Sequence, residues 1–206
     1  MRINRKISLT AATGALALLT ACGGGNGDSM AGHEGMSSSS APAATTATTA
    51  STSPSATFND GDVMFAQMMI PHHEQAVEMA DLAATRASDP EIKELAVKIK
   101  AAQDPEIQTM KDWLTDWSIH PDSGGMGHSM PGVMSEEDMK KLEAAKGKAF
   151  DKLFVQQMIA HHNGAIEMAK TEQANGSNPK AKELAKTIET TQQAEVEQLQ
   201  KILDRL

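Results

Sequence analysis

The stretch MIPHHEQAVEMA, residues 69–80, returns later in the chain as MIAHHNGAIEMA, residues 158–169. Both copies carry two adjacent histidines between methionines, at a constant offset of 89 residues (residue 69 to residue 158). The same offset relates Phe65 to Phe154 and extends through about 50 residues, which is typical of one supersecondary unit used twice. The repeat therefore decides the fold: whatever one copy forms, the chain contains twice.

Each copy is predicted to form two helices joined by a short turn. Asp89-Pro90 and Asn178-Pro179 both place an N-cap residue before a proline at the first helical position. Asn175-Gly176 indicates a helix end, and Ser135 with Asp138 resembles a capping box. No segment alternates with the period of a strand. We expect an all-α four-helix bundle made of two duplicated hairpins, with helices near residues 60–87, 90–117, 136–174 and 179–205.

The histidine pairs are predicted to face the interior of this bundle. At 100° per residue, both members of each pair fall within about 60° of the centre of the apolar stripe on their helix. Glutamine and glutamate side chains lie on the stripe of the following helix, at an equal distance from the turn. The predicted polar layer comprises His72, His73, His161, His162, Gln103, Glu106, Gln192 and Glu195.

Such a layer needs binding partners, because an unpaired buried polar group costs roughly 1–3 kcal/mol. Three interpretations stay open from the residues alone. The layer could be a hydrogen-bonded network that specifies the bundle. It could be a metal site, or a sensor of copper or pH, since histidines titrate near neutral pH.

Methionines outside the expected helices favour the metal interpretation. Gly-rich loops have no core for methionine to fill, and thioethers with imidazoles suit Cu(I). Zinc and iron are less favoured: zinc leaves the methionines unexplained, and ferritin-type iron sites use a Glu-x-x-His motif that this chain lacks. The candidate loop ligands are Met30, His33, Met36, Met126, His128, Met130 and Met134.

The N-terminus predicts export and a lipid anchor. Residues 1–21 have a basic start and an apolar run, as a lipoprotein signal peptide does. Cys22 follows at the position of the lipidated cysteine, and residues 22–57 form a flexible tether rich in Gly, Ser and Thr. Residues 58–206 are then the bundle, with repeats at about 58–117 and 136–206. We expect a protein anchored to the outer face of the cell membrane, and its net charge of −8 disfavours nucleic acid as a partner.

The paired pattern FxxxMIxHHxxAxEMA, at Phe65–Ala80 and Phe154–Ala169, resembles the domain of unknown function 305 family. The resemblance extends over roughly residues 58–206. It implies a ferritin-like four-helix bundle, usually exported. Some members, the CopM-like proteins, bind copper outside the cytoplasm and are linked to copper resistance. The metal ligands that it implies here are Met69, His72, His73, Met79, Met158, His161, His162 and Met168.

The resulting expectation is a lipoprotein that sequesters Cu(I) or hands it to a copper-trafficking protein partner. No GxSxG motif and no cysteine other than Cys22 supports nucleophilic catalysis, so we do not expect an enzyme. Two alternatives remain: a structural or interaction bundle with a buried His/Glu network, and a ferritin-like metal-dependent enzyme.

Overall fold

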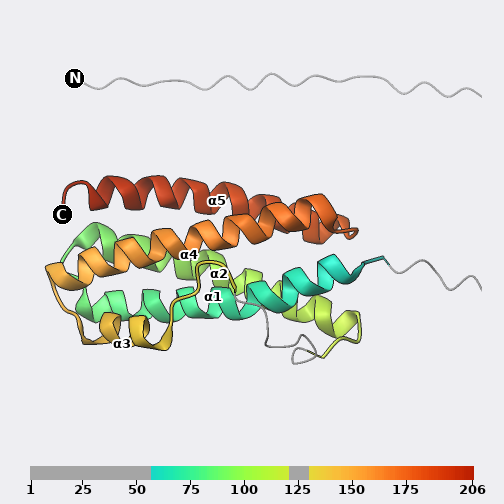
Figure 1. The fold of residues 1–206 in the computed structure, drawn as a ribbon, viewed down its shortest axis with the longest axis horizontal. Coiled ribbons are helices and arrows are strands. Elements are labelled where there is room, and N and C mark those ends of the chain that lie inside the picture. Colours follow the sequence, from blue (N-terminus) through green and yellow to red (C-terminus); the bar gives the residue numbers. More distant parts are fainter. Residues whose placement is uncertain (1–56, 121–129) are drawn as a thin grey trace, which may run out of the picture. The chain divides into compact units, whose positions relative to one another are not determined.

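The computed structural model describes residues 57–120 and 130–206, and within them all regular structure is helical (Figure 1). This confirms the all-α prediction. None of the helices in these two segments is long and apolar enough to cross a membrane. The five helices are α1 (Asp60–Arg86), α2 (Pro90–Asp116), α3 (Glu136–Ala144), α4 (Lys148–Asn175) and α5 (Pro179–Leu203).

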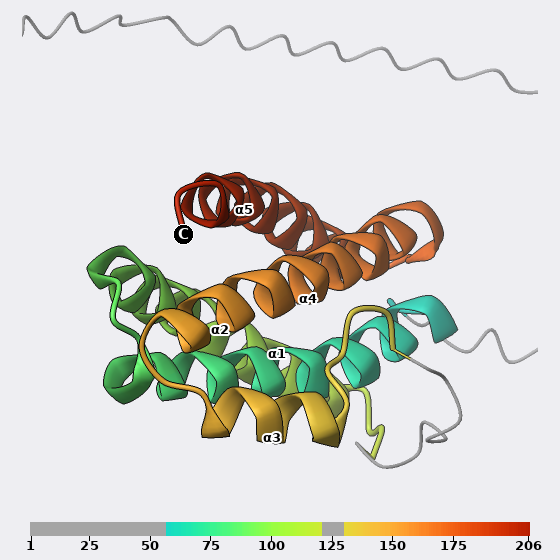
Figure 2. The same cartoon turned by 60° about the vertical axis from the view of Figure 1, so that its left-hand side comes forward.

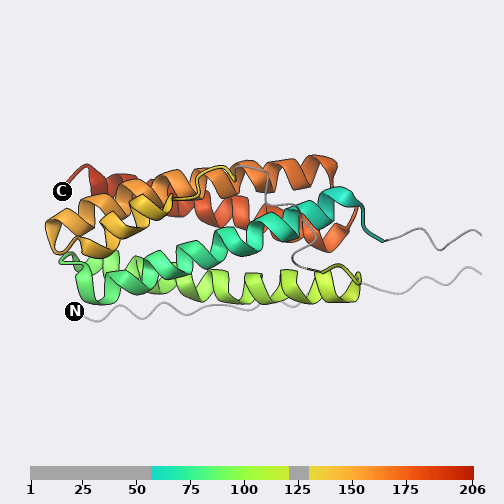
Figure 3. The same ribbon diagram turned by 60° about the horizontal axis from the view of Figure 1, so that its bottom comes forward.

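The helices form the two predicted hairpins. The most extensive packing is of α1 on α2 and of α4 on α5, and the two hairpins meet mainly through α1 and α4 (Figures 1 and 2). Figure 3 shows α1 running diagonally between α2 and α4. The first helix of each copy is therefore the inner helix.

The predicted caps account for the hairpin turns. The Asp89 side chain accepts hydrogen bonds from the backbone N–H groups of Glu91 and Ile92 at the start of α2. Asn178 plays the same part at the start of α5. Each cap satisfies N–H groups that have no partner within the first helical turn, so it fixes where the second helix of the hairpin begins.

The prediction of one continuous helix over 136–174 is wrong. Ser135 does cap a helix by accepting from the Asp138 N–H (3.1 Å), but α3 ends at Ala144 and α4 begins at Lys148. Gly147 interrupts them with φ +59°, a left-handed conformation that favours glycine. Its N–H donates to the Arg86 carbonyl at the end of α1 (2.8 Å).

Two apolar clusters lie on either side of the histidine pairs. Met69 of α1 shares one cluster with Met168 of α4, and Met79 of α1 shares the other with Met158 of α4. The residue before the pair on one helix thus packs with the residue after the pair on the other. The inner helices are antiparallel, and the two copies are related by a pseudo-twofold axis that passes near the histidines.

Two buried aspartates clamp the hairpins to each other. Asp62 of α1 accepts from the backbone N–H groups of Ser177 and Asn178, in the α4–α5 turn (Asn178, 2.9 Å). Asp151 of α4, its counterpart at the 89-residue offset, accepts from the N–H groups of Ser88 and Asp89, in the α1–α2 turn (Ser88, 2.9 Å). Each hairpin therefore caps the turn of the other with one carboxylate.

Candidate metal centre

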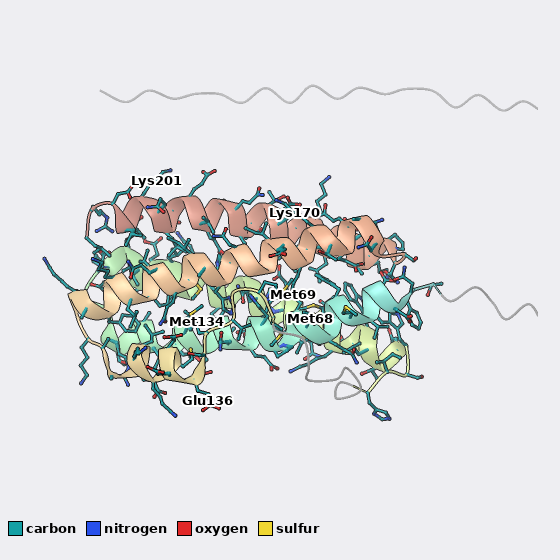
Figure 4. The ribbon with its side chains drawn as sticks, viewed as in Figure 1. Met68, Met69, Met134, Glu136, Lys170 and Lys201 are labelled. Atoms are coloured by element: carbon teal, nitrogen blue, oxygen red, sulfur yellow. The ribbon has the colours of Figure 1, made fainter. Side chains whose placement is uncertain are left out.

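The four histidines lie inside the bundle, as the helical wheel predicts. Their exposed fractions are 0% for His72, His73 and His162 and 1% for His161. Met69, labelled in Figure 4, lies on α1 one turn before the first pair. The interior position follows from the spacing of the small and apolar residues around them, which places both ring-bearing positions on the buried stripe.

The outer histidine of each pair is bonded within its own hairpin. His73 Nε2 lies 2.8 Å from Glu106 Oε2, and His162 Nε2 lies 2.7 Å from Glu195 Oε2. Both glutamates are half-buried on the outer helices α2 and α5. The sequence places these glutamates beside the histidines, and the structure pairs each with one ring.

The inner histidines face each other across the pseudo-twofold axis. The ring centroids of His72 and His161 are 3.8 Å apart, with the ring planes tilted by 44°. Neither ring nitrogen of His161 has a hydrogen-bond partner among the residues described. Gln103 is also buried in the layer, and neither its Nε2 nor its Oε1 has a hydrogen-bond partner among the described residues. The Oε1 of Gln192 likewise has none.

Residues 130–134 form a strap that leads into α3 and lies beside α1 and α4 (Figure 2). The Pro131 carbonyl oxygen lies 3.1 Å from His72 Nε2. Gln75 holds the end of the strap, because its amide bonds both the N–H (2.7 Å) and the carbonyl oxygen (2.9 Å) of Met134. On the other side, a Cβ at Gly164 would lie 2.0 Å from the Pro131 oxygen, so only glycine leaves room.

Gln75 and Gly164 occupy the same position in the two copies, so the repeat diverges where the strap crosses it. Gly132 permits the crossing: it has φ +77°, and a Cβ there would lie 2.5 Å from the Ala160 carbonyl oxygen. The strap is thus hydrogen-bonded to α1 of the first copy and packs closely against the backbone of α4 in the second copy.

The hydrogen bonds determine which nitrogen of each ring is free. A carbonyl or carboxylate oxygen can only accept, so Nε2 of His72, His73 and His162 carries a proton, and in the neutral ring Nδ1 then carries the lone pair. All four Nδ1 atoms, that of His161 included, are buried without a partner in the described segments. Orienting a ring through its other nitrogen is how proteins prepare histidines to bind metal.

Burial also keeps the inner pair neutral. It lowers the pKa of His72 to about 3, and the nearby His73 adds to this effect. Burial lowers the pKa of His161 well below its usual range, again with help from the neighbouring imidazoles, first of all His72. Neutral imidazole is the form that binds a metal, so these two rings need not lose a proton first.

The polar side chains of the layer do not converge on a single metal position. Within 57–120 and 130–206, no three His, Cys, Asp or Glu side chains are placed to hold one metal ion. Met69, Met79 and Met158 are fully buried and Met168 is 8% exposed, each within one of the apolar clusters. The arrangement is a facing pair of imidazoles with thioethers above and below, and it suits an ion satisfied by few soft ligands better than a four-coordinate one.

The predicted loop ligands are only partly described. Met130 is half-buried, and Met134 packs on the apolar cluster that contains Met79. Met134 therefore does fill a gap in the core, and the expectation that loop methionines have no core to fill is wrong for this residue. The remaining candidates lie outside the described residues: Cys22, Met30, His33, Met36, Met126 and His128.

Residues 62–203 match the model of the family described as "Domain of unknown function (DUF305)". The chain belongs to this family. A family member from Streptomyces coelicolor, named as a candidate secreted protein, is 32% identical, with a TM-score of 0.66 over 70% of this chain and 93% of its own. A fragment from Deinococcus radiodurans is 28% identical, with a TM-score of 0.65 over 72% and 98%.

CopM in its Cu(I)-bound form is 33% identical, with a TM-score of 0.59 over 70% of this chain and 96% of that one. CopM has also been solved with Cu(II) and with silver. These metals are bound by CopM, the protein to which this chain is similar. No curated protein matches the chain.

Several residues of the candidate metal centre could not be predicted from the sequence. Pro131 reaches His72 from 59 positions away, and no periodic pattern reports that contact. Two signals were present in the sequence: the retained pair Asp62 and Asp151, and the exchange of Gln75 for Gly164 inside an otherwise repeated motif. A difference between repeats marks a place where the two copies have unlike neighbours.

Proposed function

We propose that this protein binds copper as Cu(I), and that the facing imidazoles of His72 and His161 form the centre of the site. The observation that carries the proposal is the set of four buried Nδ1 atoms with no partner among the described residues. An unpaired buried polar group costs roughly 1–3 kcal/mol, and a bound ion would relieve that cost. The copper-bound forms of CopM support the choice of metal.

The surrounding ligand types favour Cu(I) over zinc or iron. Structural zinc takes four ligands in a tetrahedron, whereas Cu(I) accepts imidazole and thioether in smaller numbers. Met69, Met79, Met158 and Met168 lie in the apolar clusters on either side of the layer, one at each side on each inner helix. We propose these four methionines as additional ligands. His73 and His162 would be oriented by their hydrogen bonds to Glu106 and Glu195.

We further propose that the protein is an exported lipoprotein that sequesters Cu(I) or hands it to a trafficking partner. Support comes from the N-terminal pattern ending at Cys22 and from the relative named as a candidate secreted protein. Replacing Cys22 with Ser should move the protein out of the membrane fraction. Unchanged membrane association would contradict the anchor but not the metal site.

A structural role for the outer histidines has its own support. The short His73–Glu106 and His162–Glu195 contacts give the bundle two matched interior hydrogen bonds. On this proposal the outer pairs specify how the helices pack, in the manner of a ferritin-like four-helix bundle, while the inner pair binds metal. A bundle of that class would be built from α1, α2, α4 and α5.

The test is metal content and stability in matched variants. Protein purified with copper, zinc, iron and manganese all present should retain copper, and Cu(I) should raise its melting temperature because it binds only the folded state. His72→Ala with His161→Ala should remove both effects. His120→Ala, a change to an exposed histidine outside the layer, should leave them intact.

Two results would count against the proposal. Unchanged copper affinity in the double variant would move the site to the methionines. A variant that is destabilised by the same several kcal/mol with and without copper would mean that the inner pair is structural, through lost packing volume.

A further inference from the structure

A cavity of about 370 Å³ opens beside the strap, between α1 and α4. It is largely apolar, and three methionines line it: Met64 and Met68 of α1 and Met168 of α4. Figure 4 labels Met68 next to Met69, at the middle of the bundle. Sequence reasoning singled out Met168 but neither Met64 nor Met68.

Packing does not account for Met64, whereas Met68 is half-buried and also packs against the apolar cluster that contains Met69. They are four residues apart, so their side chains lie on one face of α1. Met64 is 52% exposed, and a large apolar side chain gains little from such a position. The corresponding residues in the second copy are Leu153 and Gln157, so the fold does not require sulfur at either place.

A buried carboxyl group lies in the same wall. Glu172 is 2% exposed and lines the cavity, yet no hydrogen-bond donor in the described segments reaches either of its oxygens. Its neighbour is another acid, Asp62. Burial, followed by the contact with Asp62, raises the pKa of Glu172 to about 8. A buried carboxyl group avoids carrying an unpaired charge either by keeping its proton, here beside Asp62, or by pairing its ionised form with a cation.

The cavity shares a wall with the histidine pair. Pro131 lines the cavity, and its carbonyl oxygen is the one that holds His72 Nε2. Pro131 therefore lies between the methionines that line the cavity, of which Met64 is exposed and Met168 is buried, and the imidazole of His72.

We infer that this cavity is a second, solvent-facing site for a soft monovalent cation, Cu(I) or Ag(I). The thioethers of Met64, Met68 and Met168 bind the ion, and the Glu172 carboxyl group releases its proton to solvent and then balances the charge of the ion. Thioethers are the neutral ligands that such ions prefer. Met64, Met68 and Glu172 belong to this site alone, whereas Met168 is also a proposed ligand of the histidine centre. A role for the cavity in passing the ion to His72 and His161 rests on the copper-binding function proposed above.

The probe is Ag(I), which does not change oxidation state, added to protein with ¹³C-labelled methionine methyl groups. The methyl signals of Met64, Met68 and Met168 should shift together in one binding step. Met64→Leu with Met68→Leu should abolish that step and leave the melting temperature of the metal-free protein unchanged, since leucine conserves volume. Met139→Leu, on α3 away from the cavity, is the matched control and should change nothing.

A second variant keeps all three thioethers. Glu172→Gln should weaken Ag(I) binding at this step by about 10-fold to 100-fold, the range seen when groups that support metal ligands are removed. Unchanged affinity in Glu172→Gln would remove the carboxyl group from the site. Methyl signals that stay still at saturating Ag(I), or a step that survives in the double leucine variant, would overturn the inference.

The histidine variant separates this inference from the proposed function. If His72→Ala with His161→Ala keeps the methyl shifts but loses the remaining silver, both sites exist. If the wild-type protein shows only the methyl step, the cavity site stands and the histidine site fails. If it binds silver only through the histidines, the cavity inference fails and the proposed function stands.

Discussion

Three of the four buried histidines donate through Nε2 to an oxygen, so their proton is fixed on one side of the ring. For His72 the acceptor is a backbone carbonyl, and for His73 and His162 it is a glutamate. The consequence is that, in the neutral ring, the buried Nδ1 carries the lone pair. A helical wheel places the rings inside but says nothing of the tautomer, because the acceptors come from other elements.

This tautomer can be measured directly. Nitrogen-15 spectra of the metal-free protein at pH 7 should show a protonated Nε2 and a bare Nδ1 for His72, His73 and His162, and Cu(I) or Ag(I) should perturb Nδ1. Exposed His120 serves as an internal reference whose nitrogens should not respond to the metal. A protonated Nδ1 on His72 would contradict the Pro131 hydrogen bond.

Glu172 gives the molecule a pH dependence with a defined sign. Its pKa is about 8 when folded, above the usual value of 4.5, so between these values the folded state keeps a proton that the unfolded state has lost. Its contribution to stability is complete below pH 4.5 and is lost as the pH rises through 8. Glu172→Gln should therefore gain stability relative to wild type by up to about 1 kcal/mol per pH unit across that window.

The measurement is urea unfolding from pH 5 to pH 8.5. Glu167→Gln makes the same chemical change at an exposed position on the same helix and should shift stability equally at every pH. Parallel curves for Glu172→Gln and wild type would show that Glu172 does not titrate in this window.

At the scale of elements, the strap depends on one missing side chain. Gly164→Ala would place a methyl group about 2.0 Å from the Pro131 oxygen, so the strap or α4 must move. Overpacking of this kind costs about 1–3 kcal/mol. We expect that loss in urea unfolding, together with faster amide exchange at the Met134 N–H, which Gln75 holds.

Asn163→Ala is the control, since Asn163 is exposed beside Gly164 and a helix tolerates alanine well. Protection at Met134 should be unchanged in that variant. Equal effects of the two substitutions would mean that the strap does not depend on the glycine.

The helix boundaries show which features of the fold the local sequence can predict. Prolines and cap residues in the sequence predict where α2 and α5 begin. In the structure both helices begin at the predicted residues, Pro90 and Pro179. The break at Gly147 was not predicted, because it is stabilised by a hydrogen bond to Arg86, far away in the chain. The strap escaped prediction for the same reason: contacts between distant segments leave no periodic signal.

At the scale of the whole molecule, the two hairpins are joined at both ends by the aspartate clamps. Asp62→Ala should destabilise the protein by about 3 kcal/mol or more, because three backbone N–H groups, those of Asn59, Ser177 and Asn178, lose their acceptor at roughly 1–3 kcal/mol each. Asp151→Ala should have a similar effect at the opposite end. The two losses should add, since the clamps share no residue.

Urea unfolding of the single and double variants measures this, with Asp60→Ala as a control in the exposed first turn of α1. A double variant no less stable than either single one would mean that the hairpins separate once one clamp is lost. The interface would then act as one unit.

The strap also shows a consequence of joining the two copies in one chain: a single segment can lie at the pseudo-twofold axis. It contacts position 72 and position 75 on one helix and the equivalent region of 160–164 on the other, so it lies close to the twofold axis. Two separate, identical hairpins would each need a strap there, and two segments cannot occupy one space. Only a continuous polypeptide can place a single asymmetric segment on a symmetry axis, and that lets twin histidines acquire unlike surroundings.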